Sequence, residues 1–502
     1  MLAASRIAAG STLLLVLALI PMVAEGQASP AVPLDDPLLP LFEHLVDRGV
    51  VRDPTPSVRP LRRADAVAAL RAASNGPDST LVDRLIRAWS PADPSISWEL
   101  NVRAGIDGFT SPRRDLMRTV DPSGTRVLGD VQAYAILGPV VLATRPTIEQ
   151  RIAIDPDWTG NRVDASATCC RWHFPEAYIS YQQGFLRVHL GQIARNWGPV
   201  GVDGIAMSNV AYARDDFAFE VLSRDLHLVS SVGFLRDTSD VEGTTIRRYQ
   251  VASRLGIRIG DRLRGAVWQT AVLEGPSRDV EGPFRNPMVL LPLVNQFGTG
   301  DRDNNVMVGA EVGWRAPNGI DLGAELAIDD IVQRNNDQFP NRWAMTLRAA
   351  GPGPGRSSWR AWYTRASSLA FRATDPMESF TERGVGLGRG WADGDRIEVR
   401  LAHPIADQWL AAVALSGFRH GEAELDQPID VDAALEKWPT GTIERTLRAA
   451  LQLSGRTGPL EARGDIGINQ VTNPAHQGGE SRTGVEARVT FQLRLGTQGR
   501  LN

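Results

Sequence analysis

The chain has 502 residues, with 54 Lys and Arg against 58 Asp and Glu and a formal net charge of −4. Because it has no excess of positive charge, it is not expected to bind nucleic acid electrostatically. Its 43% hydrophobic and 22% charged residues are typical of folded proteins and exclude wholesale disorder.

A signal peptide is predicted over residues 1–28. Arg6 supplies a positive end, residues 7–23 form an apolar run, and small residues lead to a cleavage point after Ala28. The alternative is a transmembrane anchor, but this run of 17 residues is at the short limit for a membrane span and contains Pro21. No later segment has eighteen uninterrupted apolar residues, so the exported chain is expected to be periplasmic, secreted or an outer-membrane β-barrel.

Residues 29–96 are predicted to form a small helical region. Apolar residues recur at helical spacing over 36–49, 63–73 and 78–89, and Gly49 follows the first of these runs in a C-cap position. Three helices within roughly 55 residues form too small a core to stand alone, so we expect the region to dock against a larger body.

Residues 97–502 show a hydrophobic period of two, which is the period of a β-strand. The clearest run is 485–495, where apolar residues such as Val489 alternate with polar ones such as Arg488, and 306–314 repeats the pattern. A soluble sandwich would alternate in the same way. However, the chain is predicted to be exported, its strands run in one series, and their polar faces carry both Arg and Glu or Asp, all of which favour a membrane barrel with a wet lumen.

The predicted fold class is therefore an all-β transmembrane antiparallel β-barrel. With about 22 residues per strand and connection, the 399 residues from 97 to 495 predict about 16–18 strands. In this barrel Val489 is expected to face lipid and Arg488 the lumen.

Two stretches carry a resemblance to a known family. In the first, a strand beginning at Glu176 leads into Leu-Gly-Gln at 190–192, then Arg195 and the Trp-Gly-Pro of 197–199, with Ser-Asn at 208–209. The second is Gly-Ala-Glu-Leu-Ala-Ile-Asp-Asp-Ile at 323–331. With these motifs the chain resembles the capsule assembly Wzi family, and its N-terminal helices are similar to that family's periplasmic part.

This resemblance covers nearly the whole mature chain. It implies a monomeric outer-membrane barrel of about 18 strands, with the helices of 29–96 in the periplasm. It also implies lectin-like binding that attaches or organises capsular or extracellular polysaccharide at the cell surface, in contact with outer-membrane lipid, without catalysis or a cofactor. A general porin or solute channel is the alternative function. A lipid hydrolase ranks last, because His189 has no evident serine partner.

Arg195, Trp197 and Asn209 are candidate polysaccharide-binding residues in a connection rich in Gly and Pro. An aromatic ring can stack on the apolar face of a sugar, while Arg and Asn donate hydrogen bonds to its hydroxyl or carboxylate groups. The alternative is a loop that folds inward and plugs the barrel, and one loop could do both.

Glu325, Asp329 and Asp330 form an acidic cluster at the end of a predicted strand. Period two places Glu325 and Asp329 on the lumen face, while Asp330 lies at the strand end, where a bulge or turn begins. These carboxylates could bind sugar hydroxyls or a divalent cation. The favoured interpretation is an internal network with lumen arginines.

The remaining motifs predict no chemistry. Cys169 and Cys170 are adjacent, and neighbouring Cα atoms are about 3.8 Å apart, below the usual separation in a disulfide. A free, inert pair is therefore favoured over a vicinal disulfide. The seven histidines show no close metal-ligand spacing, so neither a metal site nor a catalytic residue is predicted.

Overall fold

The structure of the protein is a computed structural model that describes residues 28–76, 78–93, 95–160, 171–239, 243–291, 304–330, 341–427 and 438–500. The predicted signal peptide, apart from Ala28, lies outside the described residues, as do Cys169 and Cys170. None of the described helices has the length and apolar character needed to cross a membrane.

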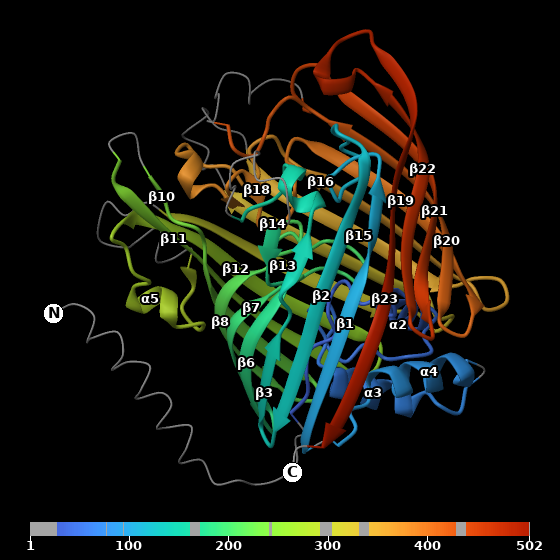
Figure 1. Cartoon of the computed structure of the whole chain (residues 1–502). Coiled ribbons are helices and arrows are strands. Elements are labelled where there is room, and N and C mark those ends of the chain that lie inside the picture. The colour runs from blue at the N-terminus through green and yellow to red at the C-terminus, as the bar shows by residue number, and fades with distance from the viewer. Residues whose placement is uncertain are drawn as a thin grey trace.

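An antiparallel β-sheet closes on itself to form a barrel (Figure 1). The first strand, β1 (Ile96–Phe109), pairs on one side with β2 (Gly124–Leu137) and on the other with the last strand, β23 (Ser481–Arg500). Three positions in the barrel wall are each filled by two short strands in succession, namely β3 with β4, β5 with β6, and β9 with β10. The barrel thus has 18 strands, which confirms the predicted fold class.

The remaining strands follow one another around the wall, except for β17 and β18, which pair separately. Their bounds are β3 (Val140–Thr144), β4 (Thr147–Glu149), β5 (Arg171–His173), β6 (Glu176–Gln183), β7 (Leu186–Ile193), β8 (Arg214–Leu222), β9 (Leu226–Phe234), β10 (Thr238–Ser239), β11 (Thr245–Ile259), β12 (Leu263–Pro276), β13 (Asn304–Arg315), β14 (Asp321–Asp330), β15 (Arg342–Pro352), β16 (Ser358–Ala366), β17 (Thr381–Glu382), β18 (Val385–Gly386), β19 (Gly394–Ala406), β20 (Trp409–His420), β21 (Glu444–Thr457) and β22 (Leu460–Thr472).

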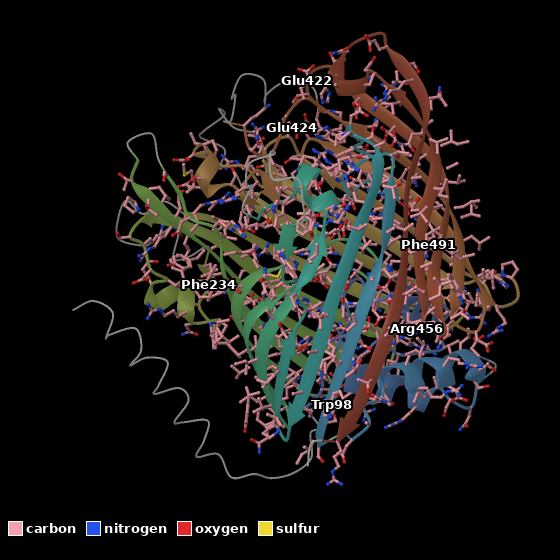
Figure 2. The ribbon with its side chains drawn as sticks, viewed as in Figure 1. Trp98, Phe234, Glu422, Glu424, Arg456 and Phe491 are labelled. Atoms are coloured by element: carbon pink, nitrogen blue, oxygen red, sulfur yellow. The ribbon has the colours of Figure 1, made fainter. Side chains whose placement is uncertain are left out.

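The outer wall is apolar and the inner wall is polar. Leu401, Val413, Leu451 and Ile466 are direct neighbours across β19 to β22, and all four side chains are exposed on the outside of the barrel. Phe234 and Phe491 are likewise exposed on this wall (Figure 2). A continuous exposed apolar row is typical of a surface that faces lipid hydrocarbon.

The face assignment of the last strand is confirmed. Arg488 on β23 lies 2.9 Å from the carboxylate of Asp107, a buried residue on β1. It therefore points into the lumen. Because side chains alternate along a strand, the neighbouring Val489 points outward.

The two ends of the barrel differ. At one end, where β1 begins and β23 ends, strands are joined by turns of two to five residues, such as 260–262 and 407–408. At the other end most connections are longer and reach 27 residues in 367–393. We call these the short-turn end and the long-connection end. Figure 2 shows Trp98 toward the first and Glu422 and Glu424 toward the second.

Three helices precede the barrel, close to where the sequence predicts them. They are α2 (Leu39–Asp47), α3 (Arg63–Ala72) and α4 (Ser79–Trp89), and apolar side chains of all three are buried in one cluster. This cluster includes Ala402 and Leu410 from the barrel wall, so the helices dock on the barrel rather than standing alone. Short helical turns lie in the connections: α5 (Gly282–Arg285), η1 (Arg151–Ile154), η2 (Pro376–Glu378) and η3 (Pro474–His476).

The helical region, residues 28–93, spans the short-turn end of the barrel (Figure 1). Arg52 and Arg84 form ion pairs with Asp261 and Asp407 on two of the short turns, at 2.7 and 3.0 Å. Other contacts reach further strands, including Arg63 with Glu99 on β1, Asp65 with Arg187 on β7, and Asp47 with Arg348 and Arg360 on β15 and β16. Contacts on opposite sides of the wall place this region across the barrel mouth.

Acid is expected to weaken the docking of the helical region through His44. Its side chain is fully buried, and its Nδ1 lies 2.7 Å from the Ser358 hydroxyl on β16. Burial, followed by the charge of Arg48, lowers the pKa of His44 to about 3. The unfolded state therefore binds a proton more readily, and stability should fall as pH decreases from about 6.5 towards 3, by at most about 1.4 kcal/mol per pH unit.

This dependence can be measured by thermal unfolding in detergent at a series of pH values. His44→Gln should flatten the slope between pH 6.5 and 3. His403→Gln is the matched control, because His403 is exposed on β19 and also contacts a serine, Ser357, at 3.0 Å. An unchanged slope in His44→Gln would assign the acid sensitivity to other groups.

Candidate ligand-binding lumen

Residues 194–213, the connection between β7 and β8, fold into the barrel, and we call them the inward loop. The backbone N–H groups of Arg59 and Asn196 each donate to the other residue's carbonyl, at 2.8 and 3.1 Å, which ties this loop to the helical region. Deeper in the loop, Ile205 and Met207 pack in the apolar cluster that also contains Trp268 of the wall. The loop thus fills part of the lumen, as the alternative interpretation of this segment expected.

Trp197 is fully buried in that cluster. Its backbone N–H donates to the carbonyl of Met207 at 2.9 Å, which closes the loop on itself. The suggested stacking of this ring on a sugar needs an exposed aromatic face, and the structure offers none at Trp197. Trp197 is instead a packing residue, because the inward fold of the loop places its ring among wall side chains.

The other two predicted loop residues have different surroundings. Arg195 forms two hydrogen bonds to the carboxylate of Asp216 on β8, one of them 2.9 Å long, so its charge is already paired. Asn209 is half-buried and lines the lumen. Of the three candidates, Asn209 alone is placed where it could contact a ligand in the lumen cavities described below.

Glu325 and Asp329 of the acidic cluster contact different segments of the chain. Glu325 is buried on the lumen face, where its Oε1 accepts a hydrogen bond from the backbone N–H of Ile205 at 3.4 Å. No arginine lies within ion-pair distance of Glu325 in the described part of the chain, so the expected arginine network does not include it. Glu325 instead helps to hold the inward loop.

Asp329 and Asp330 lie at the end of β14. Asp329 accepts a hydrogen bond from the backbone N–H of Phe371 at 3.0 Å and thereby holds another long connection. The register shifts between Ile328 and Asp330, which confirms the predicted irregularity at the end of this strand.

Two adjoining cavities occupy the lumen between the helical region and the long-connection end. Their volumes are about 610 and 440 Å³, within the range of ligand pockets. Pro40 of α2 lines both of them, as do Asn209 of the inward loop and Arg400 of β19. Arg113 and Trp391, from long connections, bound the second cavity.

The walls of these cavities are rich in arginine. Thirteen arginines line them against ten carboxylates. Most of these arginines form ion pairs, but within the described residues Arg114, Arg389, Arg400 and Arg463 have no carboxylate within 4 Å. Burial lowers the pKa of Arg389, as expected of a cation without an adjacent counter-charge. These cavities are therefore suited to an anionic group.

Arg400 and Arg463 are the clearest of these unpaired cations. Arg400 donates from Nε to the side-chain oxygen of Gln452 at 2.8 Å and lines both cavities. Arg463 on β22 lines the larger one, and its buried Nη2 has no hydrogen-bond partner among the described residues. Unsatisfied guanidinium groups bind carboxylate or sulfate oxygens well because they present several donors in a planar fork.

An aromatic side chain that the sequence analysis missed also lines the second cavity. Trp362 on β16 is half-buried and points into the lumen beside Arg360. The alternation of Arg360, Trp362 and Thr364 with outward residues is the signal that could have identified it. Trp362 offers the sugar-stacking ring that Trp197 does not.

Comparison with known proteins finds similarity in fold. No family model matches its sequence, and no curated protein matches it. Among solved structures, it is similar to Wzi of Escherichia coli, described as an outer membrane protein involved in group 1 capsule assembly and as a carbohydrate-binding β-barrel. The TM-score is 0.62 at 12% identity, over 93% of this chain and 99% of that one. The resemblance to Wzi is thus confirmed at the level of the fold.

Two other solved structures match with lower TM-scores. OccAB4 of Acinetobacter baumannii matches with a TM-score of 0.47 at 10% identity, over 81% of this chain and 99% of that one. The outer membrane protein OprD of Pseudomonas aeruginosa matches with a TM-score of 0.45 at 10% identity, over 80% and 94%.

Proposed function

We propose that this protein lies in an outer membrane and binds acidic extracellular or capsular polysaccharide, which it attaches to or organises at the cell surface. The observation that carries the proposal is what fills and lines the lumen. A helical region spans one mouth, and the inward loop fills part of the interior. The remaining cavities combine a half-buried tryptophan with guanidinium groups that have no carboxylate partner among the described residues.

The orientation follows from the two ends of the barrel. In outer-membrane barrels short turns face the periplasm and long connections face outward. We therefore infer that the helical region lies in the periplasm and the long connections lie outside, where a polymer would arrive. The likeness to Wzi, whose description includes carbohydrate binding, supports the same proposal.

The residues of the second cavity suggest how a sugar would bind. The ring of Trp362 can pack against the apolar face of a sugar, while Arg389 and Arg400 can donate to a carboxylate and Asn209 to a hydroxyl group. The proposal involves binding alone and assigns no catalytic step. A solute channel, by contrast, needs a continuous path through the mouth that the helical region spans.

Binding is tested with purified barrel in detergent and two polymers of similar length, polygalacturonate as the acidic probe and dextran as the neutral one. We expect polygalacturonate to bind more tightly. Arg400→Gln should weaken its binding about tenfold or more, because a hydrogen bond to a charged group contributes about 1.5–3 kcal/mol. Trp362→Ala should weaken the binding of both polymers.

Trp359→Ala is the matched control, because Trp359 lies three residues earlier on the same strand and pairs with the outward-facing Leu401. It should leave polymer binding unchanged. In cells, deletion of the protein should shift polysaccharide from cell-bound to released without stopping synthesis. Unchanged attachment in the deletion strain, with steady single-channel conductance of the barrel in a planar bilayer, would favour the solute channel.

A further inference from the structure

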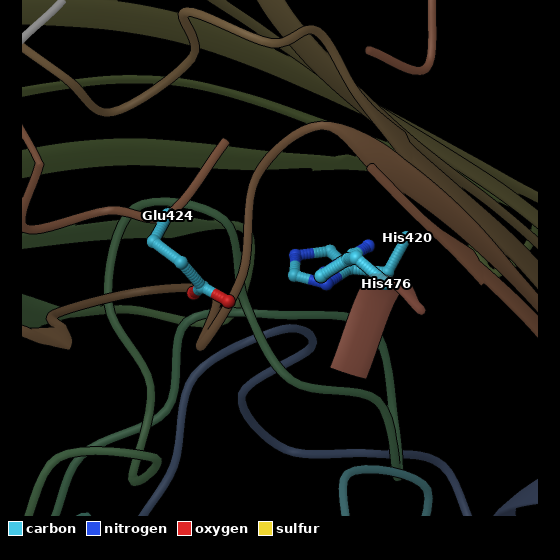
Figure 3. Close-up of side chains that lie close together, drawn as sticks. All are labelled: His420, Glu424 and His476. Atoms are coloured by element: carbon cyan, nitrogen blue, oxygen red, sulfur yellow. The ribbon is translucent and has the colours of Figure 1, made fainter. Parts of the chain in front are cut away.

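Three side chains that the lumen site does not use meet at the long-connection end of the barrel. His420 is the last residue of β20, Glu424 lies in the connection 421–443, and His476 is in η3 (Figure 3). One potential ligand atom from each lies within 4.8 Å of the other two. These residues come from the end of a strand and from two separate connections.

The ring nitrogens of the two histidines differ in their hydrogen bonds. His420 is 3% exposed, and its buried Nε2 has no hydrogen-bond partner among the described residues. His476 Nδ1 lies 2.7 Å from the carbonyl oxygen of Thr442. Because a carbonyl accepts but does not donate, Nδ1 carries the proton and Nε2 is left as an acceptor or a metal ligand.

We propose that His420, Glu424 and His476 bind a zinc-like divalent transition-metal ion that ties the two connections together. Two imidazoles and one carboxylate, with a fourth position left for water, form a familiar zinc ligand set. A ring N–H that donates to a backbone carbonyl, as at His476, is the usual outer contact of a metal-bound histidine. Calcium is disfavoured, because it prefers oxygen ligands.

To bind zinc, the three ligand atoms must move closer together. Zinc holds nitrogen and oxygen ligands at about 2.0–2.2 Å, so the ligand atoms of a tetrahedral site lie about 3.4 Å apart. The ligand atoms, which now lie within 4.8 Å of one another, would move closer by side-chain rotation. Glu424 and His476 are only half-buried, in surface connections, which leaves room for this movement.

Neighbouring charges would oppose and modulate binding. Arg118 lies 3.5 Å from the carboxylate of Glu424 and also donates to the carbonyl of Gly390. Arg113 is nearby and is paired with Asp157 at 3.3 Å. The metal ion would compete with Arg118 for Glu424, so removal of the Arg118 charge should tighten metal binding.

A bound ion would stabilise one arrangement of the outer surface. It would join the connection after β20 to the connection after β22, across the intervening strand pair. This role does not depend on what the lumen binds, so it can hold or fail independently of the proposed polysaccharide binding.

The test uses the full-length barrel in detergent, purified without a polyhistidine tag, with Zn²⁺ and Co²⁺ as probes. We expect one Zn²⁺ per barrel by competition with a chromophoric chelator, and Co²⁺ should give the visible absorption of a four-coordinate site. Zn²⁺ should raise the melting temperature and slow hydrogen exchange in 421–427 and 473–480. His476→Gln should weaken binding by more than about tenfold, because losing even an outer contact of a metal-bound histidine weakens binding about 10–100-fold.

Matched variants make the result decisive. His403→Gln changes an exposed histidine outside the group and should leave Zn²⁺ binding unchanged, while Arg118→Gln should strengthen it. If His420→Gln fails to assemble, His476→Gln remains as the test, since His476 lies in a surface turn. The proposal is overturned if wild type does not bind Zn²⁺, or if His476→Gln and Glu424→Gln bind it as tightly as wild type.

Discussion

Replacing Asp47 by alanine is expected to release the helical region from the barrel mouth. Asp47 is 2% exposed and accepts hydrogen bonds from Arg348 Nη2 and from Arg360 Nε, the latter at 2.9 Å. Without this carboxylate, the two guanidinium groups keep only longer ion-pair contacts among the described residues, 3.6 Å to Asp321 and 3.5 Å to Glu43, besides the hydrogen bond of Arg348 to the Val200 carbonyl. Breaking a buried ion pair from one side costs about 3–5 kcal/mol, because the remaining charge stays buried.

The expected result is a lower melting temperature in detergent and rapid protease cleavage within 28–93, while the barrel itself still shows heat-modifiable gel mobility. The matched control is Arg84→Ala, which removes an exposed ion pair with Asp407 at the same mouth. Such surface pairs contribute about 0–1 kcal/mol. Equal effects of the two variants would mean that Asp47 does not hold the helical region.

Replacing Leu451 by arginine is expected to impair insertion of the barrel. Leu451 lies in the middle of β21, points outward and is 66% exposed, between the outward-facing Val413 and Ile466. A guanidinium in this row faces hydrocarbon, which costs about 2–4 kcal/mol near the membrane midplane. Outer-membrane yield and heat-modifiable gel mobility should both fall.

The control variant places the same charge at a different depth in the membrane. Leu460 is the first residue of β22, beside the turn 458–459, and also points outward. Leu460→Arg should therefore cost only about 0–1 kcal/mol, since a charge near the interface reaches water. If Leu451→Arg assembles as well as wild type, the outward row around β21 does not face the hydrocarbon of the membrane.

The sequence alone determined the features that depend on local periodicity. The period of two along 485–495 predicted a strand and its faces, and the contact of Arg488 with Asp107 confirms the assignment. Helical spacing likewise predicted α3 and α4 within one residue at each end. These features can be predicted because the backbone geometry of a strand or helix sets which neighbours along the chain share a face.

Only the tertiary structure decided where the unusual residues of the connections lie. Trp197 was recognisable as an aromatic residue in a loop, but it is buried in a cluster with residues far away in the chain, such as Trp268, 71 positions later. Glu325 was correctly expected in the lumen, yet its partner is a backbone N–H of the inward loop and not an arginine. Local patterns do not contain such partners, because they depend on how a loop folds.

For the same reason, the sequence motifs did not predict either of the two candidate ligand sites. Trp362 and Arg400 line one cavity because β16 and β19 are neighbours in the closed barrel. His420 and His476 meet because the connections after β20 and β22 extend from the same end of the wall. Hydrophobic alternation could predict a barrel, but the register and closure of its strands decide which distant side chains come together, and those depend on the whole sheet.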